Sequence, residues 1–367
     1  MGVAEKIKDI EAEIARTQYN KATEYHIGLL KGKLARLRTQ LLDESSQKTK
    51  GYGLSFDVMK SGSARVALVG FPSVGKSSLL NTLTETESEA AAYEFTTLTA
   101  VPGNLYINGA KIQLLDLPGI IEGAAVGKGR GRQVISTART ADLVLMVMDA
   151  AKGDTQRRLL THELETMGIR LNTRPPDITI DIKKTGGIKF TSTVPLTHVT
   201  EHMVKNILSH EHKCHHAHVL FREDATVDQL IDVLEGNRVY MPCVYVYNKI
   251  DNVSIDAVDY FSRQPFSICT SVTNKMNLQY LLALIWRNLG LVRVYTKPRG
   301  QQPDLDEPVI LRSGATTTNI CQGIHKDMMD VFNYAYVWGC SVKHQPQKVG
   351  RDHLLADEDV VQVMTRS

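Results

Sequence analysis

A short glycine-rich segment carries the first residues whose types and spacing can do chemistry. Gly70 and Gly75 are separated by four residues, and Lys76 and Ser77 follow directly. Glycines let the backbone turn tightly and point its N–H groups at phosphate oxygens. A lysine and a hydroxyl in these places reach the β- and γ-phosphates and a Mg²⁺ ion. The segment therefore predicts a loop that contacts a nucleotide through Gly70, Phe71, Pro72, Ser73, Val74, Gly75, Lys76, Ser77 and Ser78.

The flanking sequence predicts the elements that such a loop requires. The run from Arg65 to Val69 is β-branched and apolar, as in a buried parallel strand. Helical apolar spacing resumes after Ser78, and a helix start attracts anions through its dipole and unpaired N–H groups. An ordinary glycine turn before a helix is the alternative interpretation, and the order of strand, loop and helix argues against it.

Two later segments are predicted to complete a metal and phosphate site. In the threonine-rich stretch 93–99, Thr97 is the first candidate to bind Mg²⁺ through its hydroxyl, and Thr96 is the second. A predicted strand over 111–115 delivers Asp116, which would hold Mg²⁺ mostly through water. Gly119, three residues on, would reach the γ-phosphate with its N–H. The predicted metal ligands are thus Ser77, Thr97 and Asp116, and the candidate catalytic residues are Lys76, Thr97 and Gly119.

Residue 120 bears on the rate of hydrolysis. Many GTPases place a glutamine there to orient the attacking water, whereas this chain has Ile120, which cannot hydrogen-bond to water. Slow intrinsic hydrolysis is expected unless a cation, another side chain or a partner supplies positioning and charge. In the basic, glycine-rich stretch that follows, Arg130 or Arg132 is a candidate charge stabiliser. The alternative is a loop that contacts backbone or a partner.

A fourth motif predicts which base is recognised. A predicted strand over 243–247 runs into Asn248-Lys249-Ile250-Asp251. The Asp251 carboxylate would accept hydrogen bonds from N1–H and the exocyclic amine of guanine, a donor pattern that adenine lacks. Lys249 would pack over the base and Asn248 would tie loops together. The backbone N–H of Ser271 would contact the guanine O6 region, and Val272 beside it is a further predicted nucleotide-binding residue. The four motifs in this order predict a GTP/GDP site.

The spacing of predicted strands indicates several domains. Asp149 ends a predicted strand over 142–149, and Asn248 lies 99 residues later, whereas one β–α–β crossover needs about 30. We therefore predict an α+β insertion over 165–238, with strands at 179–182, 189–194 and 218–221 and a helix at 204–208. It would interrupt a P-loop domain over 63–290. The histidine run from His210 to His218 is interpreted as a surface connection, with metal binding as the alternative.

Both ends of the chain predict small additional domains. Residues 1–50 read as two helices, in which Ile27, Leu30, Leu34, Leu37 and Leu41 form an apolar seam. The second helix carries Lys31, Lys33, Arg36 and Arg38, either as a solvated face or as a basic face for RNA. Residues 291–367 predict a β-grasp unit with strands at 292–296, 335–339 and 360–364 and a helix at 316–332. Four basic residues there are expected in one loop, solvated or facing phosphate: Lys343, His344, Lys348 and Arg351.

Composition excludes several other classes of protein. The chain has 367 residues and a net charge of +3, so any nucleic-acid contact must come from local patches. Five scattered cysteines without a CxxC pair argue for a reducing compartment and against a disulfide framework. No apolar run of membrane-spanning length and no signal-peptide core is present. A cytoplasmic protein without a membrane partner is expected.

With these motifs in hand, the chain resembles the developmentally regulated GTP-binding protein (DRG) family of Obg-related GTPases, closest to the second eukaryotic subgroup. The resemblance covers essentially the whole chain. Its carriers are GFPSVGKS (70–77), YEFTTLT (93–99), DLPGIIEGA (116–124), GKGRGRQV (127–134), GIRLN (168–172), GNRVYMPC (236–243), NKID (248–251), YTKPRGQ (295–301) and VWGCSVKH (337–344).

The resemblance implies an α/β architecture: an amino-terminal helical hairpin, a P-loop GTPase domain with an insertion, and a carboxy-terminal TGS domain of β-grasp fold. It also implies a Mg²⁺-dependent cytoplasmic GTPase that works on ribosomes or rRNA with a regulatory RWD-domain protein. Hydrolysis in such relatives is assisted by K⁺, and they usually have asparagine where this chain has Ser73. The competing interpretations are a hydrolytically weak nucleotide-dependent scaffold and a plain RNA-binding protein.

Overall fold

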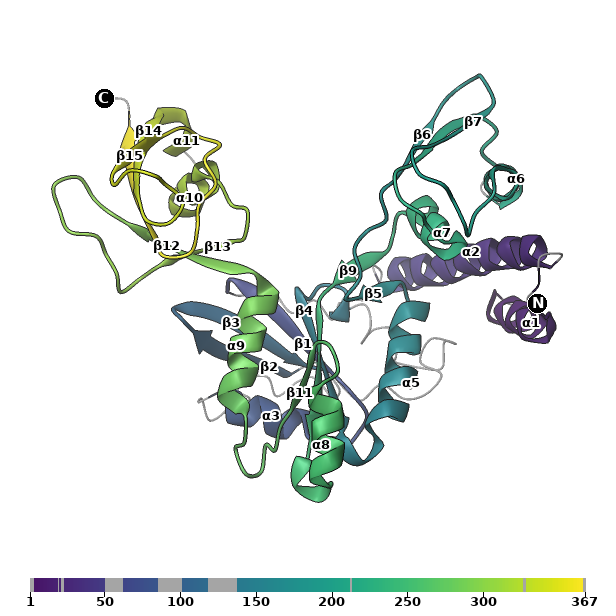
Figure 1. Ribbon diagram of the computed structural model, residues 1–367, viewed down its shortest axis with the longest axis horizontal. Coiled ribbons are helices and arrows are strands. Elements are labelled where there is room, and N and C mark those ends of the chain that lie inside the picture. Colours follow the sequence, from purple (N-terminus) through teal and green to yellow (C-terminus); the bar gives the residue numbers. More distant parts are fainter. Residues whose placement is uncertain are drawn as a thin grey trace. The chain divides into compact units, whose positions relative to one another are not determined.

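The structure is a computed structural model that describes most of the chain (Figure 1). The described residues are 3–18, 20, 23–49, 62–84, 101–117, 137–211, 213–325 and 328–365. They divide into two compact units. One contains residues 1–57, 121–139 and 158–241, and the other contains residues 58–120, 140–157 and 242–367.

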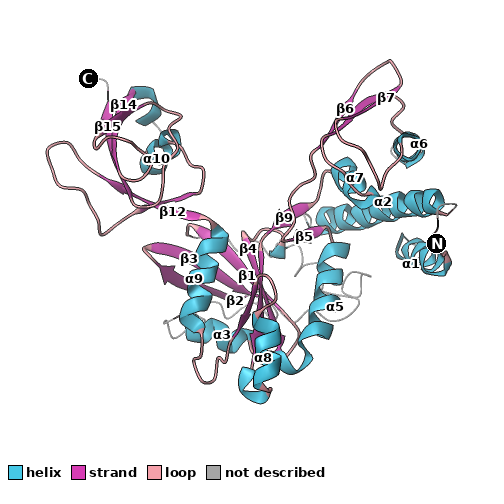
Figure 2. Ribbon diagram, viewed as in Figure 1, coloured by secondary structure: helices cyan, strands magenta, loops and turns pink. Residues whose placement is uncertain are grey.

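A six-stranded sheet forms the centre of the second unit (Figure 2). Its strand order is β11-β10-β4-β1-β3-β2, and every pairing is parallel except the β2–β3 hairpin. Every residue of β1 is buried, as expected for a parallel strand covered on both faces. The strands are β1 (Ala64–Val69), β2 (Val101–Ile107), β3 (Ala110–Asp116), β4 (Leu143–Asp149), β10 (Cys243–Asn248) and β11 (Ser267–Cys269).

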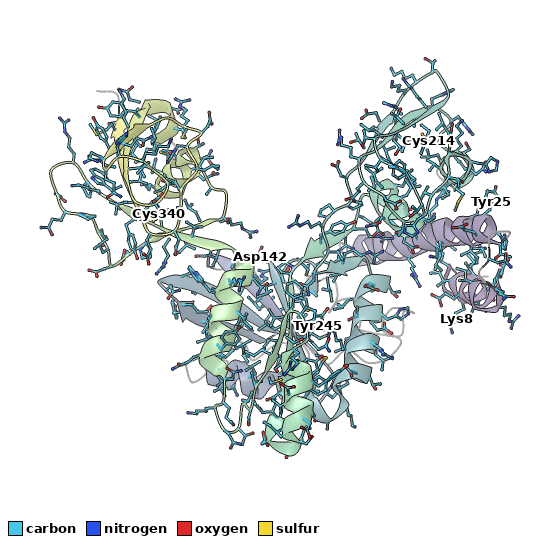
Figure 3. All side chains as sticks on the ribbon, in the orientation of Figure 1. Lys8, Tyr25, Asp142, Cys214, Tyr245 and Cys340 are labelled. Atoms are coloured by element: carbon cyan, nitrogen blue, oxygen red, sulfur yellow. The ribbon has the colours of Figure 1, made fainter. Side chains whose placement is uncertain are left out.

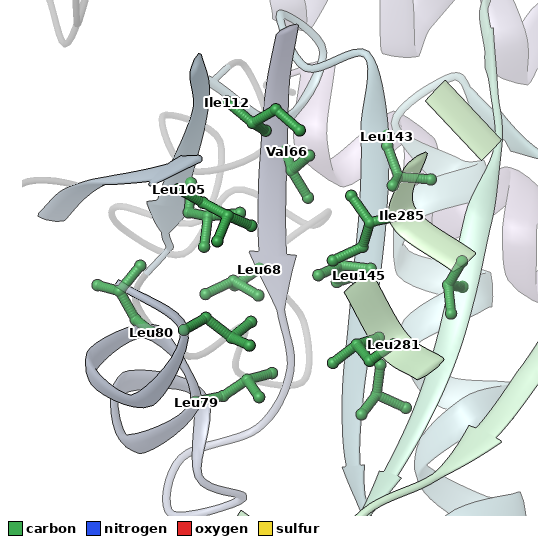
Figure 4. Packing of buried hydrophobic residues seen from close by; sticks show 14 of the residues in the cluster. Val66, Leu68, Leu79, Leu80, Leu105, Ile112, Leu143, Leu145, Leu281 and Ile285 are labelled. Atoms are coloured by element: carbon green, nitrogen blue, oxygen red, sulfur yellow. The ribbon is translucent and has the colours of Figure 1, made fainter. Parts of the chain in front are cut away.

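Helices pack on this sheet through a continuous apolar core. Leu79 and Leu80 of α3 (Lys76–Leu83) and Leu281 and Ile285 of α9 (Leu278–Leu289) meet the side chains of β1, β3 and β4 (Figure 4). This core fixes the start of α3 directly after β1, where the glycine-rich loop lies. This unit also contains α8 (Ile255–Ser262) and the short 3₁₀ turns η3 (Ala150–Lys152) and η5 (Ile250–Asn252), and α5 (Gly153–Thr166) begins in it and continues into the first unit.

The predicted insertion lies between β4 and β10, which are neighbours in the sheet. Its three-stranded sheet has the order β6-β8-β7, and β5 and β9 form a separate parallel pair. The three strands and the helix predicted there are confirmed, with their ends shifted by a few residues. The elements are β5 (Ile169–Leu171), β6 (Ile178–Ile182), β7 (Ile188–Ser192), α6 (Glu201–Asn206), the π-helical turn η4 (Ile207–Glu211), β8 (Ala217–Phe221), α7 (Val227–Glu235) and β9 (Val239–Met241).

The amino-terminal helices are α1 (Val3–Arg16) and α2 (Glu24–Thr49), as predicted. Ile7 and Ile10 pack against Leu30 and Leu34 of the predicted seam. The hairpin does not pack on this seam alone, because α2 also contacts the insertion. Two side chains of the predicted basic face are paired with acids: Lys31 with Asp228 of α7 at 2.8 Å, and Arg38 with Glu11 at 2.7 Å.

A five-stranded sheet at the carboxy-terminal end has the order β13-β12-β16-β14-β15. Its two central strands, β12 and β16, are parallel, and β12 and β13 form an antiparallel hairpin, which is a β-grasp arrangement. Ile320 and Cys321 of α10 cover one face. The elements are β12 (Leu291–Thr296), β13 (Val309–Arg312), α10 (Thr317–Ile324), α11 (Met328–Val331), β14 (Phe332–Trp338), β15 (Gln347–Val349) and β16 (Asp359–Thr365).

Two predictions in this region were wrong. The helix expected over 316–332 is two helices, because His325 is extended at φ −157° and ψ 138°, and Phe332 already belongs to β14. Met328, Met329 and Phe332 face the same core as Ile320, so the apolar spacing continues across the break. Lys348 was expected in a loop and instead lies on β15, a strand too short to show a period of two.

The cysteines are all free, and they differ in exposure. Cys243, Cys269 and Cys321 are buried, Cys214 is half-buried and Cys340 is exposed (Figure 3). Burial raises the pKa of the Cys243 thiol to about 12. Among the described residues, no helix combines the length and the apolar character that crossing a membrane requires.

Candidate functional site

The glycine-rich loop connects β1 to α3 as predicted, and its two glycines are required by their surroundings. Gly75 has φ +97°, and a Cβ there would lie 2.4 Å from Nδ2 of Asn248. A Cβ at Gly70 would lie 2.2 Å from the carbonyl oxygen of Val147. Val74 is buried in the core and fastens the middle of the loop, whereas Ser73 has φ 64° and is exposed. These contacts therefore fix the backbone conformation of the loop.

Lys76 lies folded over the loop. Its Nζ donates hydrogen bonds to the carbonyl oxygens of Gly70 at 3.1 Å and Phe71 at 2.9 Å. Burial lowers the pKa of this lysine, and the nearby charge of Asp116 works against that shift. An anion bound in the loop would favour the charged ammonium group.

Ser77 and Asp116 meet at the carboxyl ends of β1 and β3. The Ser77 hydroxyl donates to Oδ2 of Asp116 at 2.5 Å. Oδ1 of Asp116 is buried and has no hydrogen-bond partner among the described residues. Burial raises the pKa of Asp116, while the Ser77 hydrogen bond and the charge of Lys76 oppose this. A buried carboxylate with one unsatisfied oxygen beside a hydroxyl is a donor set that suits a hard divalent cation.

Asn248 joins two loops, as the sequence predicted. It ends β10, and its Nδ2 donates to the carbonyl oxygen of Val74 at 2.9 Å. Its Oδ1 accepts from the N–H of Val272 at 3.2 Å. Val272 is a predicted nucleotide-binding residue, and in this structure its N–H supports the loop through Asn248.

The adjacent Lys249 spans the same region. Its Nζ donates to the carbonyl oxygen of Ser73 at 2.8 Å and to Oδ2 of Asp149 at 3.0 Å.

Asp251 and Ser271 are also brought together. The Ser271 hydroxyl donates to Oδ1 of Asp251 at 2.6 Å, although 20 residues separate them. Ser271 is fully buried, while Asp251 is exposed in η5. The same Ser271 oxygen accepts from the N–H of Asn274 at 3.3 Å. The buried Ser271 hydroxyl thereby orients the Asp251 carboxylate, which remains exposed and accessible to a ligand.

With this geometry in view, comparison with known proteins places the chain. Family models match residues 65–184 ("50S ribosome-binding GTPase"), 185–291 ("C-terminal region of MMR_HSR1 domain") and 292–365 ("TGS domain"). Developmentally-regulated G-protein 1 of Arabidopsis thaliana is 59% identical over 100% of this chain and 92% of its own length. Developmentally-regulated GTP-binding protein 2 of Bos taurus is 59% identical and that of Homo sapiens is 58% identical, each over the full length of both chains. The chain belongs to the developmentally regulated GTP-binding protein family.

The protein is therefore a GTP-binding GTPase of the DRG family, with a P-loop GTPase domain and a TGS domain. Among solved structures, Era in complex with MgGDPNP and nucleotides 1506–1542 of 16S ribosomal RNA is 20% identical, with a TM-score of 0.35 over 62% of this chain and 57% of that one. That likeness is too remote to carry an argument.

Several predicted site residues of this DRG-family chain lie outside the described residues. These are Thr96, Thr97, Gly119, Ile120, Arg130 and Arg132. The described site residues come from the loop at 70–78, from Asp116 and from the segments at 248–251 and 271–272, and all belong to the second unit.

Sequence reasoning missed one residue of the site, Asp149. It ends β4 between the loop of β1 and the end of β10, and it accepts the hydrogen bond of Lys249. Its other oxygen accepts from the N–H of Ala151 at 3.0 Å. Asp149 could have been predicted from its position at the carboxyl end of a buried strand, because ligands bind at this end of the strands in open parallel sheets.

Proposed function

We propose that this GTPase uses Mg²⁺ and acts as a switch on ribosomes in the cytoplasm, together with a regulatory partner protein. The Mg²⁺ part of the proposal rests on Oδ1 of Asp116, which is buried beside the Ser77 hydroxyl and has no hydrogen-bond partner within the described part of the chain. Leaving such an oxygen unsatisfied costs about 1–3 kcal/mol. A bound cation or its water would satisfy it.

Ser77, Asp116 and the predicted Thr97 would hold the Mg²⁺ ion. When bound, Mg²⁺ neutralises charge on the β- and γ-phosphate oxygens. The chain itself supplies the other charges and donors. Lys76 would exchange its two carbonyl partners for phosphate oxygens, and the N–H groups of residues 70–78 would bind the phosphates. The N–H of Gly119 would reach the γ-phosphate.

Guanine would be recognised by Asp251, held in place by Ser271. Its carboxylate accepts the two donors on the Watson–Crick edge of guanine. The aliphatic stem of Lys249 would cover one face of the base, and the backbone of Ser271 would lie near O6. Water would attack the γ-phosphoryl group in line, with Lys76, Thr97 and Gly119 binding the charge that develops.

Ribosome association rests on the description of the family model that matches residues 65–184. The RWD-domain regulatory protein rests on the family resemblance alone, as does assistance by K⁺ in the absence of a glutamine at Ile120. The proposal supplies a reason for outside help: an isoleucine cannot orient water, so a cation or the ribosome would complete the site.

The first test is steady-state GTP hydrolysis in potassium or sodium buffer, with and without purified ribosomes. We expect slow hydrolysis in sodium, stimulation by potassium and further stimulation by ribosomes. Failure of ribosomes to bind or stimulate the chain would contradict the ribosomal role. GTP binding without hydrolysis under every condition would favour the second candidate, a nucleotide-dependent RNA- or ribosome-binding scaffold, which Ile120 makes a specific alternative.

The metal assignment has its own test in Ser77→Ala. The variant should bind GDP yet require at least about tenfold more Mg²⁺ for half-maximal hydrolysis. Ser262→Ala is the matched control, because that hydroxyl is exposed and donates to the carbonyl oxygen of Asp259 in the same helix. An unchanged Mg²⁺ requirement in Ser77→Ala would overturn the assignment.

A further inference from the structure

The outer face of the carboxy-terminal sheet carries a row of aromatic rings. Along β14, Ala335 and Val337 point into the core, so the alternate residues Tyr334, Tyr336 and Trp338 point to the opposite face. All three residues are intermediate in exposure, neither buried nor fully exposed. Packing against α10 uses only the face of β14 that carries Ala335 and Val337. The aromatic residues on the opposite face are therefore not needed for that packing.

The strand register extends this row across the sheet. Lys348 of β15 and Gln362 of β16 lie directly opposite Tyr336 on its two sides. Val360 pairs with both Trp338 and Tyr295. The outward positions of β12, β14, β15 and β16 carry no acidic residue.

The rings are close enough to act together. Tyr334 and Tyr336 have ring centroids 5.3 Å apart, and Tyr336 and Trp338 have centroids 6.4 Å apart. Lysines lie at both ends of the row. Nζ of Lys348 is 4.0 Å from the Tyr334 ring centroid, and Nζ of Lys297 is 5.9 Å from that of Trp338.

We propose that this surface, the aromatic platform of Tyr334, Tyr336, Trp338, Lys297 and Lys348, binds single-stranded RNA. Lys348 covers the Tyr334 ring, so two consecutive bases would stack on Tyr336 and Trp338. The phosphates on either side would meet Lys348 and Lys297. Partly exposed aromatic rings between cations on an open sheet are the chemistry that recognises unpaired bases, because every base has a stacking face.

The same observations disfavour other ligands. A duplex hides its base faces in the helix, so it could use only the two lysines of the platform. An acidic peptide would likewise use the lysines and leave Tyr336 and Trp338 without a function. The proposal deepens the proposed ribosomal role by naming the RNA chemistry that the TGS domain would recognise.

The test uses the full chain and a fluorescein-labelled single-stranded oligouridylate, with binding followed by anisotropy. Tyr336→Thr keeps a β-forming residue and should weaken binding by roughly five- to a hundredfold, the loss expected for one stacked base. Tyr106→Thr is the matched control, since Tyr106 is an exposed tyrosine on β2. Lys348→Gln should lower the slope of log affinity against log salt by about one.

A second readout reports stacking directly. The chain has two tryptophans, Trp286 and Trp338. In a Trp286→Phe background, the oligouridylate should quench the fluorescence of Trp338. Purely electrostatic binding would leave this fluorescence unchanged.

The outcomes separate this inference from the proposed function. Unaltered binding by Tyr336→Thr, absence of quenching, or equal affinity for a duplex would each overturn the platform. So would failure of the chain to bind the oligouridylate while Tyr336→Thr disrupts a partner protein instead. Ribosome co-sedimentation of the unaltered chain and of Tyr336→Thr is measured in parallel. Co-sedimentation of both at equal strength would leave the ribosomal role standing without the platform.

Discussion

At the scale of single residues, one side-chain amide holds the candidate site together. Asn248 fastens the phosphate loop through the carbonyl oxygen of Val74 and the base-side loop through the N–H of Val272. The same amide fills the space beside Gly75 in which a Cβ would clash. A nucleotide therefore meets two loops that are already positioned, which lowers the ordering cost of binding.

The specificity of the site is tested by Asp251→Asn. Replacing the carboxylate with an amide removes one acceptor for guanine and adds a donor, which fits the C2 carbonyl of xanthine. We expect GDP affinity to fall by about a hundredfold or more, since two hydrogen bonds to a charged acceptor are affected. Binding of xanthosine diphosphate should rise, as measured by competition against a fluorescent nucleotide.

Asp256→Asn provides the control for this change, because Asp256 is an exposed aspartate in the first turn of α8. It should leave both affinities unchanged. If Asp251→Asn retained full preference for guanine, the assignment of this carboxylate would be wrong.

At the scale of elements, a buried ion triad secures the start and end of the insertion. Asp232 of α7 is 5% exposed and accepts from Arg170 of β5 at 2.6 and 2.8 Å. It also accepts from Arg238, just before β9, at 2.9 Å. One carboxylate thus joins the helix to both segments that lead into and out of the insertion.

Removing that carboxylate should be far more destabilising than removing an exposed one. Asp232→Ala leaves two guanidinium groups facing each other without an anion, and we expect a loss of about 3–5 kcal/mol in unfolding free energy. Asp259→Ala breaks the exposed pair with Arg263, the residue that follows α8, and should cost far less than Asp232→Ala. Urea denaturation measures both, and equal losses would contradict the role of the triad.

The sequence predicts local features better than contacts between distant residues, because each motif or hydrophobic pattern covers only a short segment of the chain. Contiguous motifs such as 70–77 and 248–251 name their own side chains, and the structure brings the described ones close to one another. Asp149 was missed because its partner Lys249 is 100 residues away, and nothing local marks the pair. The helix predicted over 316–332 was wrong because hydrophobic spacing reports which side faces the core, and two helices and a strand share that side. The aromatic platform required the strand register, which alternation within 332–338 does not reveal.

At the scale of the whole molecule, the described nucleotide site belongs to one of two compact units. Ligand binding to the folded state stabilises it by about 2.7 kcal/mol at a concentration a hundredfold above Kd. We expect GDP with Mg²⁺ to slow amide exchange in β1, β3 and β10 much more than in β6, β7 and β8, which belong to the other unit. Hydrogen-exchange mass spectrometry with and without nucleotide tests this. Equal protection of the two groups of strands would show that nucleotide binding stabilises both units to the same extent.

The position of the insertion also sets the order in which the chain can fold. Val74 and its partner Asn248 are 174 residues apart, and β10 can pair with β4 only after the whole insertion has been synthesised. Contacts this distant in sequence slow folding, and domains made early on the ribosome fold before later ones. A nascent chain that ends before residue 248 has the phosphate loop but lacks both the amide that fastens it and the carboxylate that would select guanine. Nucleotide can therefore assist folding only after residues 248–251 have emerged.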